Sequence, residues 1–114
     1  MKAIAPSAHR VLDYATVVLF AAAPTIFGLT GGAAKLSYAL AVVHGLMTLL
    51  THFRDGDRKL LPFRVHMVVE ILVGIALILV GVSVFPAARI FFCGVGVLIL
   101  LVVLVSFGGA LGEE

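Results

Sequence analysis

Charged residues are scarce in this chain: Asp, Glu, Lys and Arg make up only 12% of its 114 residues, while 62% are hydrophobic. A soluble domain carries roughly 25% charged residues and about 45–50% apolar ones, so the composition argues against a water-soluble globule. Length sets a second bound, because a membrane-spanning helix needs about 20 residues. Four spans fit with short connections, whereas a large soluble catalytic domain does not. We therefore expect one transmembrane domain covering residues 1–114.

The residues of several common active sites are also lacking. The single cysteine, Cys93, lies in an apolar segment, so an internal disulfide is excluded. No serine stands in a nucleophile elbow, and the glycine-rich pieces lack the lysine of a phosphate-binding loop. Too little soluble surface is left for reading nucleic acid. We therefore predict no catalytic residues and a function that is non-enzymatic rather than enzymatic. The lipid bilayer is the main partner that we expect.

Four apolar runs dominate what is present, and each is long enough to cross a bilayer. None shows an apolar period of two, so strands and an outer-membrane barrel are set aside. The fold class is all-α: an integral membrane four-helix bundle built from two tandem helical hairpins. The predicted spans are Val11–Leu29, Ala33–Phe53, Val65–Val84, and a fourth that opens at Pro86 and runs to about Phe107.

The basic residues predict the orientation of these spans. Two basic residues, Lys35 and Arg89, fall on one side of the predicted membrane, and six fall on the other: Lys2, Arg10, Arg54, Arg58, Lys59 and Arg64. Basic residues gather on the cytoplasmic side of a membrane protein, so both termini and the central loop are predicted to be cytoplasmic. The first apolar run is too long for a signal peptide and carries Asp13, so we expect the N-terminus to be the mature one.

The two halves of the chain resemble each other in their unusual residues. A proline followed by a histidine and then a carboxylate four residues later opens each odd-numbered span. Two further pairs are each separated by 54 residues: Lys35 with Arg89, and Phe53 with Phe107. We predict a parallel repeat about a pseudo-twofold along the membrane normal. Its parts are repeat 1 (about 4–53), a cytoplasmic loop (about 54–64), repeat 2 (about 65–107) and a tail (108–114).

Two histidine–carboxylate pairs are the polar residues that need explanation. His9 and Asp13 are four residues apart, as are His66 and Glu70, and residues at that spacing share one face of a helix. A carboxylate inside a span is costly, by about 2.5–3.5 kcal/mol near its centre, and usually faces a partner in the bundle interior. The repeat places both pairs at similar depth on the cytoplasmic side, where His52 also ends its span. We predict that the pairs face each other.

The functional hypothesis that follows is a transition metal or haem site. Histidine is the commonest metal ligand, sets of histidine and carboxylate suit Zn, Fe or Mn, and bundles build such sites from facing helices. Haem would use two axial histidines, taken from His9, His44 and His66. The candidate ligands for a metal ion are His9, Asp13, His44, His66 and Glu70.

Two alternatives stay open. In the first, each carboxylate pairs locally with its histidine, or with Arg10 or Arg64, and the protein is a structural or accessory subunit without a ligand. In the second, the same groups relay protons or bind a polar solute for a small carrier. Such a carrier would act as an oligomer, and a larger membrane complex is a further partner to consider.

The segment Ala23-Pro24-Thr25-Ile26-Phe27-Gly28-Leu29, with Phe85-Pro86 in the second half, resembles the small membrane proteins of the SPW-repeat family. In that family a two-span unit recurs, with a proline motif near the end of a span. The resemblance implies a multi-pass protein of the bacterial inner membrane. It supplies no catalytic or ligand-binding residues.

Overall fold

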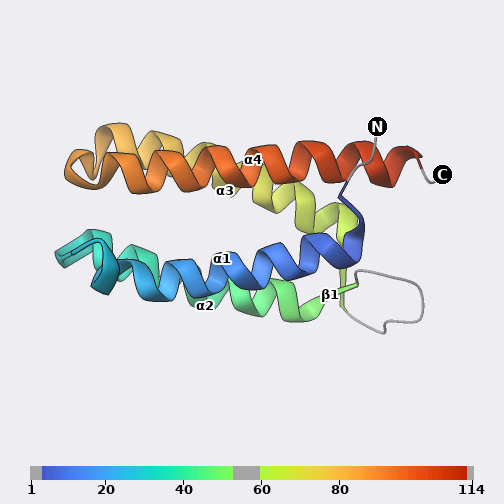
Figure 1. Cartoon of the computed structure of the whole chain (residues 1–114), viewed down its shortest axis with the longest axis horizontal. Coiled ribbons are helices and arrows are strands. Elements are labelled where there is room, and N and C mark those ends of the chain that lie inside the picture. The colour runs from blue at the N-terminus through green and yellow to red at the C-terminus, as the bar shows by residue number, and fades with distance from the viewer. Residues whose placement is uncertain (1–3, 53–59, 113–114) are drawn as a thin grey trace.

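The protein contains four long helices, arranged as two antiparallel pairs (Figure 1). The computed structural model describes residues 4–52 and 60–112, with side chains for 4–51 and 60–106. The helices are α1 (Pro6–Ile26), α2 (Gly31–Leu50), α3 (Phe63–Ser83) and α4 (Arg89–Gly112), and α4 follows a short 3-10 helix η1 (Pro86–Ala88). Helices α1 and α2 pack along each other, as do α3 and α4. The helical class predicted from the sequence is confirmed.

Helix α1 begins five residues earlier than the predicted span and ends soon after Pro24. A proline removes a hydrogen-bond donor and cannot continue a regular helix far, and the helix stops at Ile26. The turn to α2 then uses Gly28 and Gly31, whose φ angles are 66° and 56°. Only glycine adopts this left-handed region without steric cost. The early start matters most, because it places His9 on the same helix as Asp13.

Between the two helix pairs lies a short parallel strand pair that the sequence did not predict. Strand β1 (Thr51–His52) pairs with β2 (Leu61–Pro62). Helix α2 therefore ends at Leu50, earlier than the predicted Phe53. Pro62 is extended and caps the start of α3, as expected for a residue that lacks an N–H and fits the entry of a helix better than its interior. The pair holds Thr51 beside the first turns of α3.

The side chains show a narrow interior and a broad apolar exterior. Each helix buries about one residue per turn; in α2 these are Ala33, Ser37, Ala41, His44 and Thr48. Many large apolar side chains are exposed instead, among them Val18, Val42, Leu72 and Leu104. This pattern suits hydrocarbon rather than water as the surrounding medium. Three helical segments are long and apolar enough to cross a membrane: Gly31–Leu50, Phe63–Ser83 and Pro86–Ser106.

Helix α1 is not among those three segments. It has 21 residues, but its first turns carry His9, Arg10 and Asp13, which lower its hydropathy. The structure thus agrees with a membrane protein in which at least three helices could cross the bilayer.

Helices α3 and α4 approach closely through glycine. A Cβ built on Gly96 would lie 2.7 Å from the carbonyl oxygen of Gly74, and one on Gly74 would lie 2.8 Å from Leu100 Cγ. Small residues in the apolar runs, Gly74 and Gly94 among them, are the candidates that the sequence offers for such close contacts. Gly74 makes the contact, but the prediction for Gly94 is wrong. Gly94 is exposed and has nothing within 4 Å of a built Cβ. Small residues at a helix interface allow such close packing in membranes.

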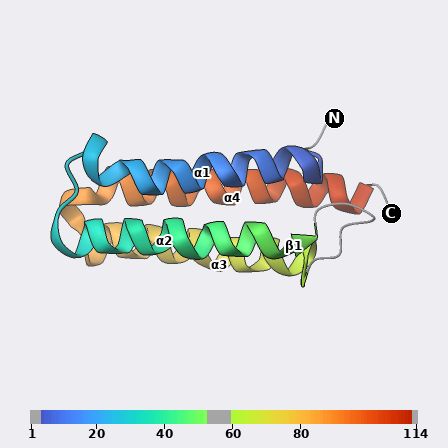
Figure 2. The same ribbon diagram turned by 90° about the horizontal axis from the view of Figure 1, so that it is seen from below.

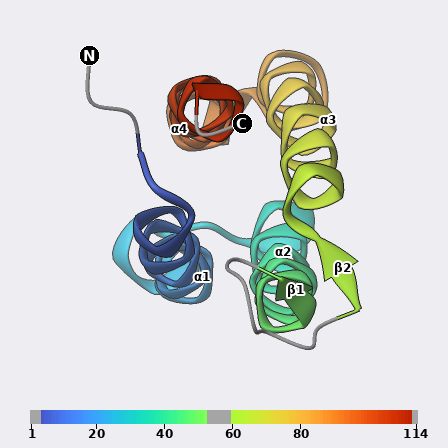
Figure 3. The same cartoon turned by 90° about the vertical axis from the view of Figure 1, so that its right-hand side faces the viewer.

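Several helix ends lie together at one end of the molecule. The start of α1, the end of α4 and strand β1 are at the same end of the molecule (Figure 2). There α3 leans away from α4 and toward α2, as the end view shows (Figure 3). This tilt carries the first turns of α3 toward the α1–α2 pair.

Candidate metal centre

Four side chains from two helices form a buried polar cluster at that end. His9 and Asp13 come from α1, and His66 and Glu70 come from α3; each is at most 3% exposed. One possible ligand atom from each residue lies within 4.8 Å of all the others. The i, i+4 spacing turns both members of each pair to one helix face, and the tilt of α3 brings the two faces together. The predicted meeting of the two pairs is present.

Both carboxylates bridge between the two imidazoles. His9 Nε2 is 3.0 Å from Glu70 Oε1 and 3.3 Å from Asp13 Oδ1. His66 Nε2 is 2.8 Å from Asp13 Oδ2 and also contacts Glu70 Oε1. The ring centroids of His9 and His66 are 5.6 Å apart and nearly perpendicular. Both Nε2 atoms therefore point to one small volume between the two carboxylates.

Hydroxyl groups hold the other nitrogen of each ring. His9 Nδ1 is 2.7 Å from Ser106 Oγ on α4, and His66 Nδ1 is 2.6 Å from Thr51 Oγ1 at the end of α2. Each histidine thus takes its hydroxyl partner from the opposite helix pair. Metal-binding histidines characteristically use their second nitrogen in this way, because the outer hydrogen bond fixes the ring and its tautomer.

The proton positions around His66 can be worked out. Thr51 Oγ1 donates its only proton to the carbonyl of Met47, at 2.6 Å, so toward His66 the hydroxyl oxygen accepts. His66 Nδ1 must then carry the proton, and in the neutral ring Nε2 presents a lone pair. That lone pair faces oxygen atoms of both Asp13 and Glu70. Acceptors that face each other in this way need a positive partner between them: a proton, on the ring or on a carboxyl group, or a metal ion.

His44 stands at the edge of the cluster and is not one of its four closely grouped residues. Its Nε2 atom is buried and lies 3.5 Å from Asp13 Oδ1. Among the described residues His44 Nε2 has no hydrogen-bond partner, although buried polar atoms are normally satisfied. This atom is therefore open to a further ligand. His44 packs its ring against Phe20 and His66.

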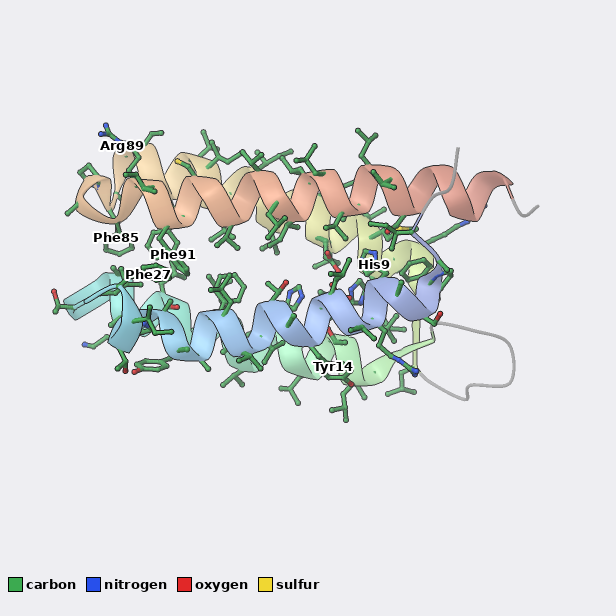
Figure 4. All side chains as sticks on the ribbon, viewed as in Figure 1. His9, Tyr14, Phe27, Phe85, Arg89 and Phe91 are labelled. Carbon is green, nitrogen blue, oxygen red and sulfur yellow. The ribbon has the colours of Figure 1, made fainter. Side chains whose placement is uncertain are left out.

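Apolar and aromatic groups surround the polar atoms. Phe63 packs edge-on against His9 with ring centroids 5.1 Å apart, and the fully buried Met67 follows His66 on α3. In the side view His9 points from α1 toward the α3–α4 pair (Figure 4). In surroundings of low polarity the two carboxylates gain strongly from a positive partner.

The sequence identified the five candidate ligands, and all five lie in or beside this cluster. The arrangement suits an ion better than haem, because His9 and His66 converge on the same oxygen atoms and leave no flat slot between their rings. The side chain of His52 lies outside the described part of the chain. Ser106 and Thr51 were missed, since serines were considered only as nucleophiles. Their position in the last turns of the even-numbered spans was the available signal.

The chain matches no family model, no curated protein and no solved structure. The site is therefore interpreted from its own geometry, and the resemblance to the SPW-repeat family stays a prediction.

Proposed function

We propose that this protein is a multi-pass membrane protein that binds one divalent transition metal ion between α1 and α3. His9 Nε2, His66 Nε2 and one oxygen each from Asp13 and Glu70 would be its ligands. The observation that carries the proposal is the placement of His66, whose Nδ1 is held by Thr51 while its Nε2 contacts two buried carboxylates. A cation resolves that arrangement, and two carboxylates balance the charge of a dication.

The ligand set narrows the choice of metal. Two imidazole nitrogens and two carboxylate oxygens suit zinc, iron(II), manganese(II) or cobalt(II). Copper(I) prefers sulfur ligands, and this set contains none, so copper(I) is disfavoured. A tetrahedral ion with bonds of 2.0–2.1 Å places its ligand atoms about 3.3 Å apart. Three of the nitrogen–oxygen distances are 2.8 to 3.3 Å, and His66 Nε2 and Glu70 Oε1 lie closer. All four ligand atoms lie within 4.8 Å of one another, so the side chains would have to adjust to reach tetrahedral spacing. His44 would then orient Asp13 from outside the ligand set.

The site would lie within the membrane near the cytoplasmic side. Asp13 is seven residues into α1, or about 10 Å along the helix axis. We propose that α1 crosses the membrane with the other three helices, because the buried cluster removes its polar side chains from lipid. Six of the eight basic residues lie on the side of the termini and the central loop, which favours the cytoplasm as that side.

The metal content of the purified protein tests this function. Protein in detergent or nanodiscs is loaded with zinc or cobalt(II), freed of excess ion, and analysed by mass spectrometry of the elements. We expect about one ion per chain in the wild type and in Ser37→Ala, and much less in His66→Ala. Ser37→Ala is the matched control, since Ser37 donates a buried hydrogen bond to Phe20 O away from the cluster.

A wild-type protein without bound metal would overturn the proposal. In that case the cluster would be structural, its histidines would carry the compensating protons, and His66→Ala would destabilise the protein whether or not metal is added. Equal metal content in wild type and His66→Ala would also contradict it, because the ion would then be bound elsewhere.

A further inference from the structure

A lateral groove between α1 and α4 leads from the outer surface to the two carboxylates. It has a volume of about 140 Å³. Its wall on α1 contains Leu12, Asp13, Ala15, Thr16 and Leu19, its wall on α4 contains Leu98, Ile99 and Val102, and Glu70 of α3 closes its inner side. The groove thus touches the candidate metal centre on a side that none of the histidines lines.

The outer rim of this groove faces the lipid in the proposed orientation. Leu12 is 39% exposed and Leu98 is 48% exposed. Along α1 the lining residues lie 6 to 13 positions after Pro6, or about 9 to 20 Å from the start of the helix. At that depth a span is surrounded by hydrocarbon rather than by water. A molecule that enters the groove must therefore come from the membrane.

The polar groups of the groove are confined to its inner end. Among the described residues that line it, only Asp13 and Glu70 are charged. The Thr16 hydroxyl already donates its proton to the carbonyl of Leu12, at 2.8 Å. Asp13 Oδ2 is buried at this inner end and lies 2.8 Å from His66 Nε2, inside the candidate metal centre. A ligand would therefore pass through an apolar groove that ends at the carboxylate oxygens of Asp13 and Glu70 and at the proposed ion.

From this geometry we infer that the groove admits the hydroxyl group of a lipid-soluble alcohol to the metal centre. The inference rests on the proposed function. Two carboxylates and a dication are neutral together, so a neutral oxygen is favoured over a third carboxylate, which would add an uncompensated buried charge. A cavity of about 150 Å³ accommodates a benzene-sized molecule. The groove therefore has room for the hydroxyl and the first carbons, while the remaining chain lies in the lipid.

The test uses the protein loaded with cobalt(II) in nanodiscs, because the visible absorption of cobalt(II) responds to its ligands. The probe is 1-decanol, and decane serves as the control that lacks the oxygen atom. We expect a saturable change of the cobalt spectrum with decanol and none with decane. Val102→Phe fills the groove and should weaken the decanol response at least tenfold while cobalt stays bound.

Val97→Phe is the matched control variant. Val97 is 46% exposed on the same helix but does not line the groove, so its response to decanol should equal that of the wild type. Ala15→Leu fills the groove from α1 and should act like Val102→Phe, which covers the case in which that variant does not fold.

Three results would overturn the inference: no decanol effect on the wild type, an equal effect of decane, or an undiminished effect in both groove-filling variants. A wild type that binds no cobalt is a different result, because it refutes the proposed function itself.

Discussion

Thr51 and His66 are joined by a hydrogen bond of 2.6 Å between Oγ1 and Nδ1. Because Thr51 gives its own proton to Met47, this contact fixes the tautomer of His66 and directs Nε2 of that ring toward the two carboxylates of the cluster. A residue at the end of α2 thereby determines the chemistry of a residue on α3.

Replacing Thr51 by valine should weaken metal binding by 10- to 100-fold. Valine has nearly the same shape but cannot accept the proton of His66 Nδ1, and loss of an outer hydrogen-bond partner typically costs that much affinity. Thr51→Ser keeps the hydroxyl and should restore most of the affinity. Competition with a chelator gives the affinity. Nitrogen NMR of the imidazole should show Nδ1 protonated in the wild type and a mixture of tautomers in Thr51→Val; unchanged tautomers would contradict the assigned role.

Metal should stabilise the wild type but not Glu70→Gln. A ligand present at 100 times its Kd stabilises the folded state by about 2.7 kcal/mol, and an amide cannot replace the charge of Glu70 at the ion. Unfolding in a denaturing detergent, with and without zinc, measures the difference. The control Ser37→Ala is expected to be less stable than the wild type yet to gain the same increment from zinc. A full zinc increment in Glu70→Gln would remove Glu70 from the ligand set.

His44→Ala should have a smaller effect than His66→Ala. His44 Nε2 lies 3.5 Å from Asp13 Oδ1 and outside the group of four ligand atoms, so we expect a loss of affinity below tenfold. The cobalt(II) spectrum distinguishes the two roles, since removing a ligand changes the coordination and removing an outer partner does not. A changed spectrum in His44→Ala would make His44 a fifth ligand.

Metal affinity should fall as the pH falls. The ion binds imidazole lone pairs and ionised carboxylates, and protons compete for both. Below neutral pH each bound ion displaces at least one proton, so the apparent Kd should rise about tenfold or more per pH unit. Titrations between pH 8 and pH 5 test this sign. A Kd that does not change over that range would contradict binding to histidine.

The packing of α3 on α4 gives a prediction that does not involve metal. Gly96→Ala would place a Cβ 2.7 Å from the carbonyl oxygen of Gly74, and overpacking of this kind costs about 1–3 kcal/mol. Gly94→Ala, two residues earlier on the same helix, meets nothing within 4 Å and should leave the free energy of unfolding unchanged. Equal stability of the two variants would mean that the helices do not approach at Gly96.

The sequence by itself indicated a membrane protein and determined the helices and the ligand candidates. Long apolar runs with few charges favour a lipid surrounding, and a histidine four residues before a carboxylate places both on one helix face, whatever the tertiary structure. The histidine–carboxylate pairs were also predicted to meet, because polar groups in lipid need partners. The parallel repeat that suggested where they meet remains a prediction.

The tertiary structure alone decided how the cluster is completed. The tilt of α3 and the strand pair at Thr51 bring hydroxyl groups from the ends of α2 and α4 onto the two imidazoles, across 15 and 97 residues of chain. No local pattern encodes such contacts, since they depend on where each helix ends and how the pairs lean. The same holds for the choice of Gly96 over Gly94, because which face of α4 meets α3 is fixed by packing between helices.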